Sequence, residues 1–205
     1  MRLATIMKTF QISSVLVCLS LLSSIVPSLT YARQTKNSSA ISLPSIAQLG
    51  INLNGAYYRA TGNQIIAGNE QIRGIRPFEC VEFAYGRAIE RGLFKNSQGI
   101  GTVLNGDAHT WDDRIANSSY RSRLNKQVRV NSVVVWEADL KFTWQEGNTT
   151  YSYATDPIAG HVAFVEKVYP DGSFLISEGN HQARPLIKLI KAKTPVAKAA
   201  KFIYL

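Results

Sequence analysis

The stretch PFECVEFAYGRAIERG, Pro77–Gly92, is the strongest helix signal in the chain, and the other segments are interpreted around it. Apolar side chains recur through it at helical spacing: Val81, Ala84, Tyr85, Ala88 and Ile89. Pro77 suits a first helical turn because its missing N–H would have no partner there, and Gly92 is a typical C-terminal stop. The pattern predicts a helix that begins at Pro77 and carries Cys80 in its first turn.

The position of Cys80 in the first turn of the predicted helix favours a role as a nucleophile. The unpaired amide groups and the positive end of the dipole at a helix N-terminus stabilise the thiolate, which is the nucleophilic form of cysteine. The alternative is a small buried hydrophobe, which is how most free cysteines behave. A histidine placed to serve as a base for Cys80 would favour the first interpretation.

Strand signals follow the helix. Apolar runs rich in β-branched residues predict strands over 128–136, 161–168 and 173–178. A hairpin is expected over 141–153, turning at Gly147-Asn148, and Phe202–Tyr204 is expected as an edge strand. A helix followed by antiparallel strands predicts an α+β domain, with the cysteine helix packed on an antiparallel β-sheet.

Of the three histidines, His161 is the best candidate for the base. It opens a predicted strand that would fix its ring, and Gly160 before it allows another backbone or a substrate to come close. His109 lies in a glycine-rich loop region, and His181 follows the last strand of the predicted 161–178 hairpin. A thiol at a helix terminus and a base on a rigid strand are the minimal parts of a thiol hydrolase.

The hairpin after His161 predicts which side chains hold its ring. If Asp171-Gly172 is a two-residue turn, Ala163 faces Asn180. Asn180 is then the diagonal neighbour of His161, while Glu178 lies one pair further along unless a bulge or twist brings it in. A three-residue loop would reverse the parity, so the prediction depends on the turn type.

Several segments resemble the CHAP family, which comprises cysteine, histidine-dependent amidohydrolases and peptidases with a papain-like fold. The segments are Pro77–Ala88 (PFECVEFAYGRA), Gly106–Trp111 (GDAHTW), Gly160–Glu166 (GHVAFVE) and Ile176–Asn180 (ISEGN). The resemblance extends from about Arg76 to the C-terminus. The last two segments carry the strongest signal because they match in spacing as well as in identity.

The resemblance implies that Cys80 is the nucleophile, that His161 is the general base, and that Glu178 and Asn180 orient the histidine. Such enzymes cleave the muramoyl–alanine amide of peptidoglycan or a peptide bond in its stem or cross-bridge, without a cofactor. The family commonly has Gly-Gln before the cysteine, where the glutamine helps to form the oxyanion hole, but this chain has Phe78-Glu79. That departure favours an alternative, a catalytically idle member that binds peptidoglycan or regulates another hydrolase.

No metal site is expected. Some family members bind calcium through aspartates shortly before the cysteine, but the chain has no aspartate between Gly55 and Glu79. The sequence also has no His/Cys cluster with metal-ligand spacing and no glycine-rich phosphate loop.

The first 32 residues predict a signal peptide. Arg2 and Lys8 are the only charges before an apolar run from Ile12 to Leu29, and small residues follow around Ala32. The rival interpretation is an uncleaved membrane anchor, although serines and a proline dilute its short apolar core.

We therefore expect a signal peptide over 1–32, a linker over 33–70 and a CHAP-like catalytic domain over 71–205. The protein would be secreted, or held in the periplasm or cell envelope, with no stable membrane span after cleavage. Export argues against another amide substrate of this chemistry, a glutathione–polyamine conjugate, because such conjugates are cytoplasmic.

The positive net charge of the chain indicates which kinds of molecule it would bind. Lysine and arginine number 23 against 14 acidic residues, a formal net charge of +9. An exported basic protein meets anionic envelope polymers before nucleic acid, so such polymers are expected as partners beside peptidoglycan. Nucleic acid is not expected because no recognised binding module is present. The lysines that would contact such polymers, if they are not merely a solvated face, are Lys188, Lys191, Lys193, Lys198 and Lys201.

Aromatic residues on the 141–153 hairpin suggest a substrate surface. They are Phe142, Trp144, Tyr151 and Tyr153, and such rings stack on sugar faces. Trp144 and Tyr151 are the expected substrate contacts. The alternative is a plain two-stranded excursion with one packed face. Trp111 is expected in the core, beneath the cysteine helix.

Overall fold

The computed structural model describes residues 42–52, 79–95, 98–179 and 186–205. The strands are β1 (Leu124–Asn125), β2 (Ser132–Trp136), β3 (Lys141–Glu146), β4 (Thr149–Ala154), β5 (His161–Val168), β6 (Phe174–Glu178), β7 (Leu186–Ile190) and β8 (Lys201–Tyr204). The α-helices are α2 (Cys80–Glu90), α3 (Trp111–Ala116) and α4 (Pro195–Ala199). Short 3-10 turns are η1 (Ala47–Leu49), η3 (Gly99–Thr102), η4 (Ala108–Thr110) and η5 (Arg121–Arg123).

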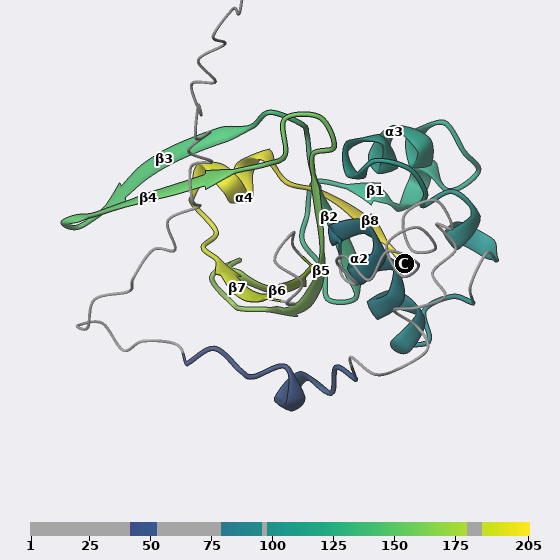
Figure 1. The fold of residues 1–205 in the computed structure, drawn as a ribbon, viewed down its shortest axis with the longest axis horizontal. Coiled ribbons are helices and arrows are strands. Elements are labelled where there is room, and N and C mark those ends of the chain that lie inside the picture. Colours follow the sequence, from purple (N-terminus) through teal and green to yellow (C-terminus); the bar gives the residue numbers. More distant parts are fainter. Residues whose placement is uncertain (1–41, 53–78, 96–97, 180–185) are drawn as a thin grey trace, which may run out of the picture. The chain divides into compact units, whose positions relative to one another are not determined.

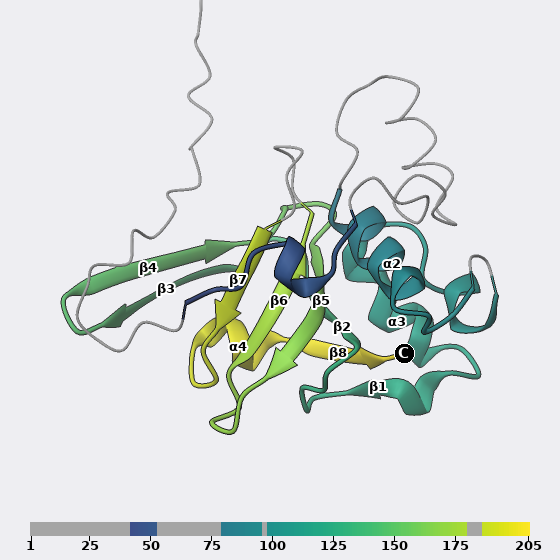
Figure 2. The same ribbon diagram turned by 90° about the horizontal axis from the view of Figure 1, so that it is seen from below.

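Six strands form one antiparallel sheet in the order β1-β8-β2-β5-β6-β7, and β3 and β4 form a separate hairpin. Helices α2 and α3 lie on one side of the sheet, while α4 and the β3–β4 hairpin lie on the other (Figures 1 and 2). The arrangement is an α+β papain-like fold with the cysteine helix packed on an antiparallel sheet, as the sequence predicts.

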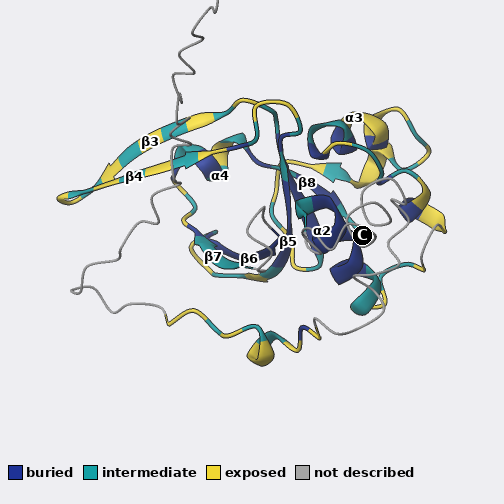
Figure 3. Ribbon diagram, in the orientation of Figure 1, coloured by how far each residue is buried: buried dark blue, intermediate teal, exposed yellow. Residues whose placement is uncertain are grey.

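The sheet is covered on both faces, which accounts for the continuous apolar run of β2. Val133 and Val135 face a cluster formed with α2 and α3, whereas Val134 and Trp136 face a second cluster formed with α4 and the hairpin. All five residues of β2 are buried (Figure 3). Trp111 is fully buried in the first cluster, as predicted.

Helix α2 begins at Cys80, with Glu79 as its N-cap, so the cysteine is the first helical residue. The start predicted at Pro77 is therefore wrong, because Glu79 has an extended backbone (φ −62°, ψ 157°) and the helix cannot run through it. Pro77 itself lies outside the described residues. At the other end Gly92 has φ +70°, its N–H donates to the Ile89 carbonyl, and the Leu93 N–H donates to the Ala88 carbonyl. This pair of bonds is a Schellman motif, so Gly92 ends the helix as predicted.

The C-terminal strand β8 is not at the edge of the sheet, so that prediction is wrong. It pairs with β2 on one side and with the two-residue strand β1 on the other. Local sequence gives little signal for a strand as short as β1. The hairpin prediction is correct, because β3 and β4 pair from Lys141↔Ala154 to Glu146↔Thr149 around Gly147-Asn148.

The register of the β5–β6 hairpin also differs from the prediction. The loop has three residues, Pro170-Asp171-Gly172, because the Tyr169 N–H donates to the Ser173 carbonyl at 2.8 Å and Gly172 has φ +83°. The pairing then shifts between Val165 and Lys167, where Glu166 is an extra residue on β5.

The three-residue loop moves each β6 side chain to the opposite face of the sheet from the one predicted, and the bulge moves those beyond it back again. Beyond it, Phe164 pairs with Ser177, so the next pair along would place Glu178 opposite Ala163, on the face that carries His161. Without the bulge, the loop register would place Glu178 opposite Phe164, on the face toward α2. Glu178 is therefore the diagonal neighbour of His161, the place that the sequence analysis gave to Asn180.

A buried ion pair holds the bulge. Arg87 of α2 donates from Nε to Glu166 Oε1 at 2.8 Å and from Nη2 to Glu166 Oε2 at 3.0 Å. Ser177 Oγ donates to the same carboxylate at 2.6 Å. Arg87 also pairs with Glu90 and donates to the Leu49 carbonyl, which ties the segment 42–52 to α2. Both side chains of the Arg87–Glu166 pair are almost fully buried.

Within the part of the chain that is described, no helix is both long enough and apolar enough to cross a bilayer. The predicted signal segment, residues 1–32, lies outside that part.

Replacing Arg87 removes the cation from a buried ion pair. We expect Arg87→Met to lower the free energy of unfolding by about 3–5 kcal/mol, because the Glu166 carboxylate stays buried without its main partner. Urea denaturation measures this change. Arg91→Met, one turn further along at an exposed position, is the matched control and should change stability by less than about 1 kcal/mol. Equal losses in the two variants would contradict the importance of the pair.

Candidate active site

The structure brings Cys80, His161 and Glu178 together. His161 Nε2 lies 2.8 Å from Glu178 Oε2, and the His161 side chain is hydrogen-bonded to Cys80. Because Nε2 is taken by Glu178, Nδ1 is the ring nitrogen available to the sulfur. Cys80 is half-buried against the α2 side of the core, at the amino end of the helix.

Helix geometry gives Cys80 two advantages. As the first residue of α2, it lies among the four amide groups that have no partner within the helix. The positive end of the helix dipole is directed at the same place. Both effects favour negative charge on the sulfur.

A tight loop positions His161 at the start of β5. Asp156 Oδ1 accepts hydrogen bonds from the Ile158 and Ala159 N–H groups, and the His109 N–H donates to the Ala159 carbonyl at 2.9 Å. Gly160 has φ +71°, and a Cβ there would lie 2.7 Å from the Trp136 carbonyl oxygen and 2.8 Å from His109 Cβ. No other residue fits this position, which agrees with the close approach predicted for Gly160.

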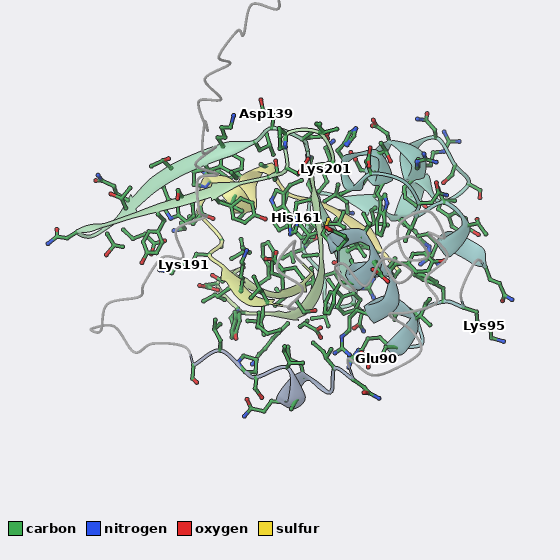
Figure 4. The ribbon with its side chains drawn as sticks, viewed as in Figure 1. Glu90, Lys95, Asp139, His161, Lys191 and Lys201 are labelled. Carbon is green, nitrogen blue, oxygen red and sulfur yellow. The ribbon has the colours of Figure 1, made fainter. Side chains whose placement is uncertain are left out.

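Trp136 supports the imidazole from the neighbouring strand. It pairs with His161 across β2 and β5, and the two rings stack with centroids 5.9 Å apart and an interplanar angle of 21°. The Trp136 Nε1–H donates to the Val196 carbonyl at 2.8 Å, which fixes the indole. Figure 4 shows His161 between α2 and the β3–β4 hairpin.

The charges of the three groups reinforce one another. Burial lowers the pKa of His161, but the charge of Glu178 and the hydrogen bonds with Cys80 and Glu178 outweigh it and raise the pKa to about 10. Burial raises the pKa of Glu178, but the charges of Lys188 and His161 outweigh it and bring the pKa to about 2. At neutral pH the imidazole is therefore a cation and the glutamate an anion.

Lys188 is a member of this site that the sequence analysis did not identify. Its Nζ forms an ion pair with Glu178 Oε1, the oxygen that does not face His161. The sequence placed Lys188 only among lysines that would meet anionic polymers. Its β7 strand, LIKLI, gives no local signal that one lysine faces a buried acid.

The hairpin aromatics divide into two groups. Tyr153 packs at a tilt on Trp136, with centroids 5.6 Å apart, and its pKa is raised well above the usual value by burial and by the charges of Glu178 and Cys80. Trp144 and Tyr151 stack on each other further along the hairpin, 5.5 Å apart. Tyr153 is therefore the hairpin aromatic whose pKa responds to the charges of the site. The sequence indicated it only as one of four aromatic residues on the hairpin.

A cavity of about 90 Å³ lies between the hairpin and β7. Trp144, Tyr151 and Tyr153 line it from the hairpin side. The two predicted substrate contacts thus share one hollow with the tyrosine that adjoins the site, and their role in substrate binding stays a prediction.

Part of the predicted site lies outside the described residues. Asn180, His181 and Phe78 belong to this part, as does the segment preceding Glu79 in which no calcium-binding aspartate is expected. Over the described ranges, no group of three or more His, Cys, Asp or Glu side chains is placed to hold a metal ion.

The C-terminal lysines form internal contacts more than the sequence indicates. Besides Lys188, Lys191 pairs with Glu146, and Lys201 pairs with Asp112 and Glu137. Lys193 and Lys198 are exposed, so they fit the predicted contact with anionic polymers better than the other three.

Glu178→Gln tests the ion pair through the pH dependence of stability. The lowered pKa of Glu178 makes its contribution full above pH 4.5 and lost as pH falls toward about 2. The raised pKa of His161 makes its contribution full below pH 6.5 and lost as pH rises toward about 10. The stability difference between the wild type and Glu178→Gln, from urea denaturation at a series of pH values, should be largest between these windows, at pH 4.5 to 6.5.

Glu146→Gln is the control, because Glu146 pairs with Lys191 and with no histidine. The difference in stability between the wild type and Glu146→Gln should stay constant as the pH rises above 6.5. A level difference for Glu178→Gln over the same range would contradict the ion pair with His161.

Comparisons with known proteins identify what this chain is similar to. The family model of the CHAP domain matches residues 72–180. An N-acetylmuramoyl-L-alanine amidase domain-containing protein of Staphylococcus aureus is 31% identical over 126 residues, which are 60% of this chain and 16% of that protein. A crystal structure of N-acetylmuramoyl-L-alanine amidase from Staphylococcus aureus is 29% identical, with 62% of this chain and 30% of that chain covered and a TM-score of 0.44.

The chain spans a small part of the length of both relatives. The CHAP domain match, in contrast, covers more than half of this chain and includes Cys80, His161 and Glu178. This chain belongs to the CHAP domain family.

Proposed function

We propose that this chain is an exported peptidoglycan hydrolase that cleaves an amide bond with Cys80 as nucleophile and His161 as acid and base. The observation that carries the proposal is the hydrogen-bonded series from Cys80 through His161 to Glu178. The relative that is 31% identical carries N-acetylmuramoyl-L-alanine amidase in its name, which supports peptidoglycan as the substrate. The bond cut is the muramoyl–alanine amide or a peptide bond in the stem or cross-bridge.

The mechanism follows from the charges. A protonated His161 beside the sulfur favours the thiolate, which attacks the carbonyl carbon of the amide. His161 then gives its proton to the leaving amine, and an acyl group remains on Cys80. His161, now neutral, takes a proton from water, which attacks the thioester and releases the acid. Glu178 holds the ring in one orientation throughout and balances the imidazolium charge, and we propose that Asn180 assists it.

The oxyanion of the tetrahedral intermediate needs donors. The Cys80 backbone N–H supplies one, because the first amides of α2 have no intrahelical partner. Glu79 stands where the family commonly has glutamine, and a carboxylate cannot donate a hydrogen bond when it is ionised. The absence of one donor costs about 100- to 1000-fold in rate.

We propose that the substrate lies along the hollow beneath the β3–β4 hairpin. Trp144 and Tyr151 would contact the glycan or the stem peptide, and exposed Lys193 and Lys198 would contact anionic envelope polymers. Export fits the substrate, because peptidoglycan lies outside the cytoplasmic membrane. The first 32 residues would serve as the signal peptide that directs export.

A second candidate function is supported by Glu79 alone. A chain with the same fold and a weak oxyanion hole could bind peptidoglycan or regulate another hydrolase without cutting it. Alkylation of Cys80 at neutral pH by iodoacetamide separates the two. A Cys80 primed by His161 is labelled rapidly and loses most of this rate in His161→Ala, whereas an inert thiol is labelled slowly in both.

Hydrolysis of purified peptidoglycan tests the proposal. Cys80→Ala should reduce the release of soluble fragments by at least about 1000-fold, to background, because the nucleophile is gone. In the full-length chain, Cys18→Ser changes the cysteine of the predicted signal peptide, so it is the control for the loss of a thiol and should retain wild-type turnover. Mass spectrometry of the fragments identifies the bond, since an amidase frees the amine of the stem alanine. Equal activity in Cys80→Ala and wild type would overturn the proposal.

A further inference from the structure

The Glu178 carboxylate is held between two cations from two different strands. Its Oε2 faces His161 on β5, and its Oε1 pairs with Lys188 on β7. The Glu178 side chain is 1% exposed, while that of Lys188 is 34% exposed. The carboxylate therefore has both oxygens occupied, and the lysine approaches it from the solvent side.

A carboxylate this deeply buried is costly unless opposite charge accompanies it. Of the groups that lower the pKa of Glu178, Lys188 has the largest effect, ahead of His161. The two cations differ, because His161 changes its charge in the proposed catalytic cycle and Lys188 does not. Lys188 keeps the carboxylate ionised in the steps in which His161 is neutral.

Lys188 is also fixed in place. Its Nζ lies 5.5 Å from the centroid of the Tyr153 ring, which itself packs on Trp136. The ammonium is thus confined between an aromatic face and a carboxylate, an arrangement that restricts a long and flexible side chain. A cation held in one place exerts a constant field on the groups around it.

We propose that Lys188 is a positioning residue that acts through Glu178, fixing the carboxylate on His161 and setting the pH range in which Cys80 reacts. The inference rests on the proposed function and deepens it, because it names a residue that regulates the same site. Lys188 does not touch the reacting atoms.

The direction of the effect follows from electrostatics. Among the described residues, the titratable groups that interact with Glu178 are His161 from β5, Lys188 from β7 and Tyr153 from β4. Cys80 from α2 interacts with His161 and Tyr153. The raised pKa of Tyr153 keeps its phenol neutral over the working range. A fixed positive charge lowers the proton affinity of every group near it, so its removal moves both the acidic and the alkaline limb of reactivity to higher pH.

Lys191, the residue that follows β7, provides a matched control. It pairs with Glu146, and its Nζ lies 5.9 Å from the centroid of the Tyr151 ring, so it repeats the arrangement of Lys188 without His161. If Lys188 only joined the hairpin to the main sheet, its replacement would affect the reactivity of Cys80 no more than replacement of Lys191 does.

The test measures the alkylation rate of Cys80 by iodoacetamide against pH in the full chain carrying Cys18→Ser. In Lys188→Met and Lys188→Gln we expect both limbs of the profile to move to higher pH by on the order of one unit. Lys188→Arg should restore the wild-type profile because it keeps the charge, and Lys191→Met should leave the profile unchanged. Two neutral variants are used so that one that does not fold can be set aside.

A Lys188→Met or Lys188→Gln profile that superimposes on the wild type would overturn the inference, as would an equal displacement in Lys191→Met. Alkylation needs no substrate, so the result is independent of the proposed function. Displaced alkylation profiles with no hydrolysis of peptidoglycan by any variant would support the role of Lys188 and reject the hydrolase. Where hydrolysis is present, its pH profile should move in the same direction as alkylation.

Discussion

One extra residue on β5 determines which face of the sheet Glu178 occupies. The three-residue loop after β5 would place Glu178 toward α2, opposite Phe164, and the bulge at Glu166 returns it to the face of His161. The bulge is held by Arg87, which reaches it from the helix that begins with Cys80. The same ion pair thus fixes the strand register and attaches the cysteine helix to that strand.

Two buried acids organise the site in the same manner. Glu166 receives Arg87 from α2, and Glu178 receives Lys188 from β7, so each joins β5 or β6 to a neighbouring element. Cys80 and Arg87 are seven residues apart, two helical turns, and therefore lie on one face of α2. Anchoring Arg87 to β5 turns that face, and the cysteine with it, toward the sheet. Buried charge costs stability unless it is paired, so these pairs specify one arrangement of helix and strand.

Much of the fold is predictable from local sequence. The helical spacing from Val81 to Ile89, the β-branched runs of β2 and β5, and the turn at Gly147-Asn148 each depend on neighbours in the chain, and each is present in the structure. The role of Gly160 is predictable for the same reason, because a glycine is the residue type that lets another part of the chain approach its backbone closely. Cys80 and His161 follow from these elements, since each lies at the first residue of one.

The remaining features depend on partners that are distant in the sequence. A bulge belongs to the pairing of two strands, so Glu166 carries no local sign of it. The predicted register failed at the three-residue loop and again at this bulge. Lys188 lies in an apolar strand, and only the packing of β7 beside β6 shows that it faces Glu178. Strand β8 was expected at an edge because its outer neighbour β1 has two residues. Sequence patterns identify elements, whereas charge partners and strand order depend on tertiary packing.

The proposed chemistry requires that His161 is charged at neutral pH, between the sulfur of Cys80 and the carboxylate of Glu178. Nitrogen NMR of the ¹⁵N-labelled imidazole of His161 measures this directly. With its pKa raised to about 10, the ring should carry protons on both nitrogens at neutral pH and lose one only as the pH approaches about 10. A neutral ring at neutral pH, titrating at the ordinary value of 6.5, would contradict it.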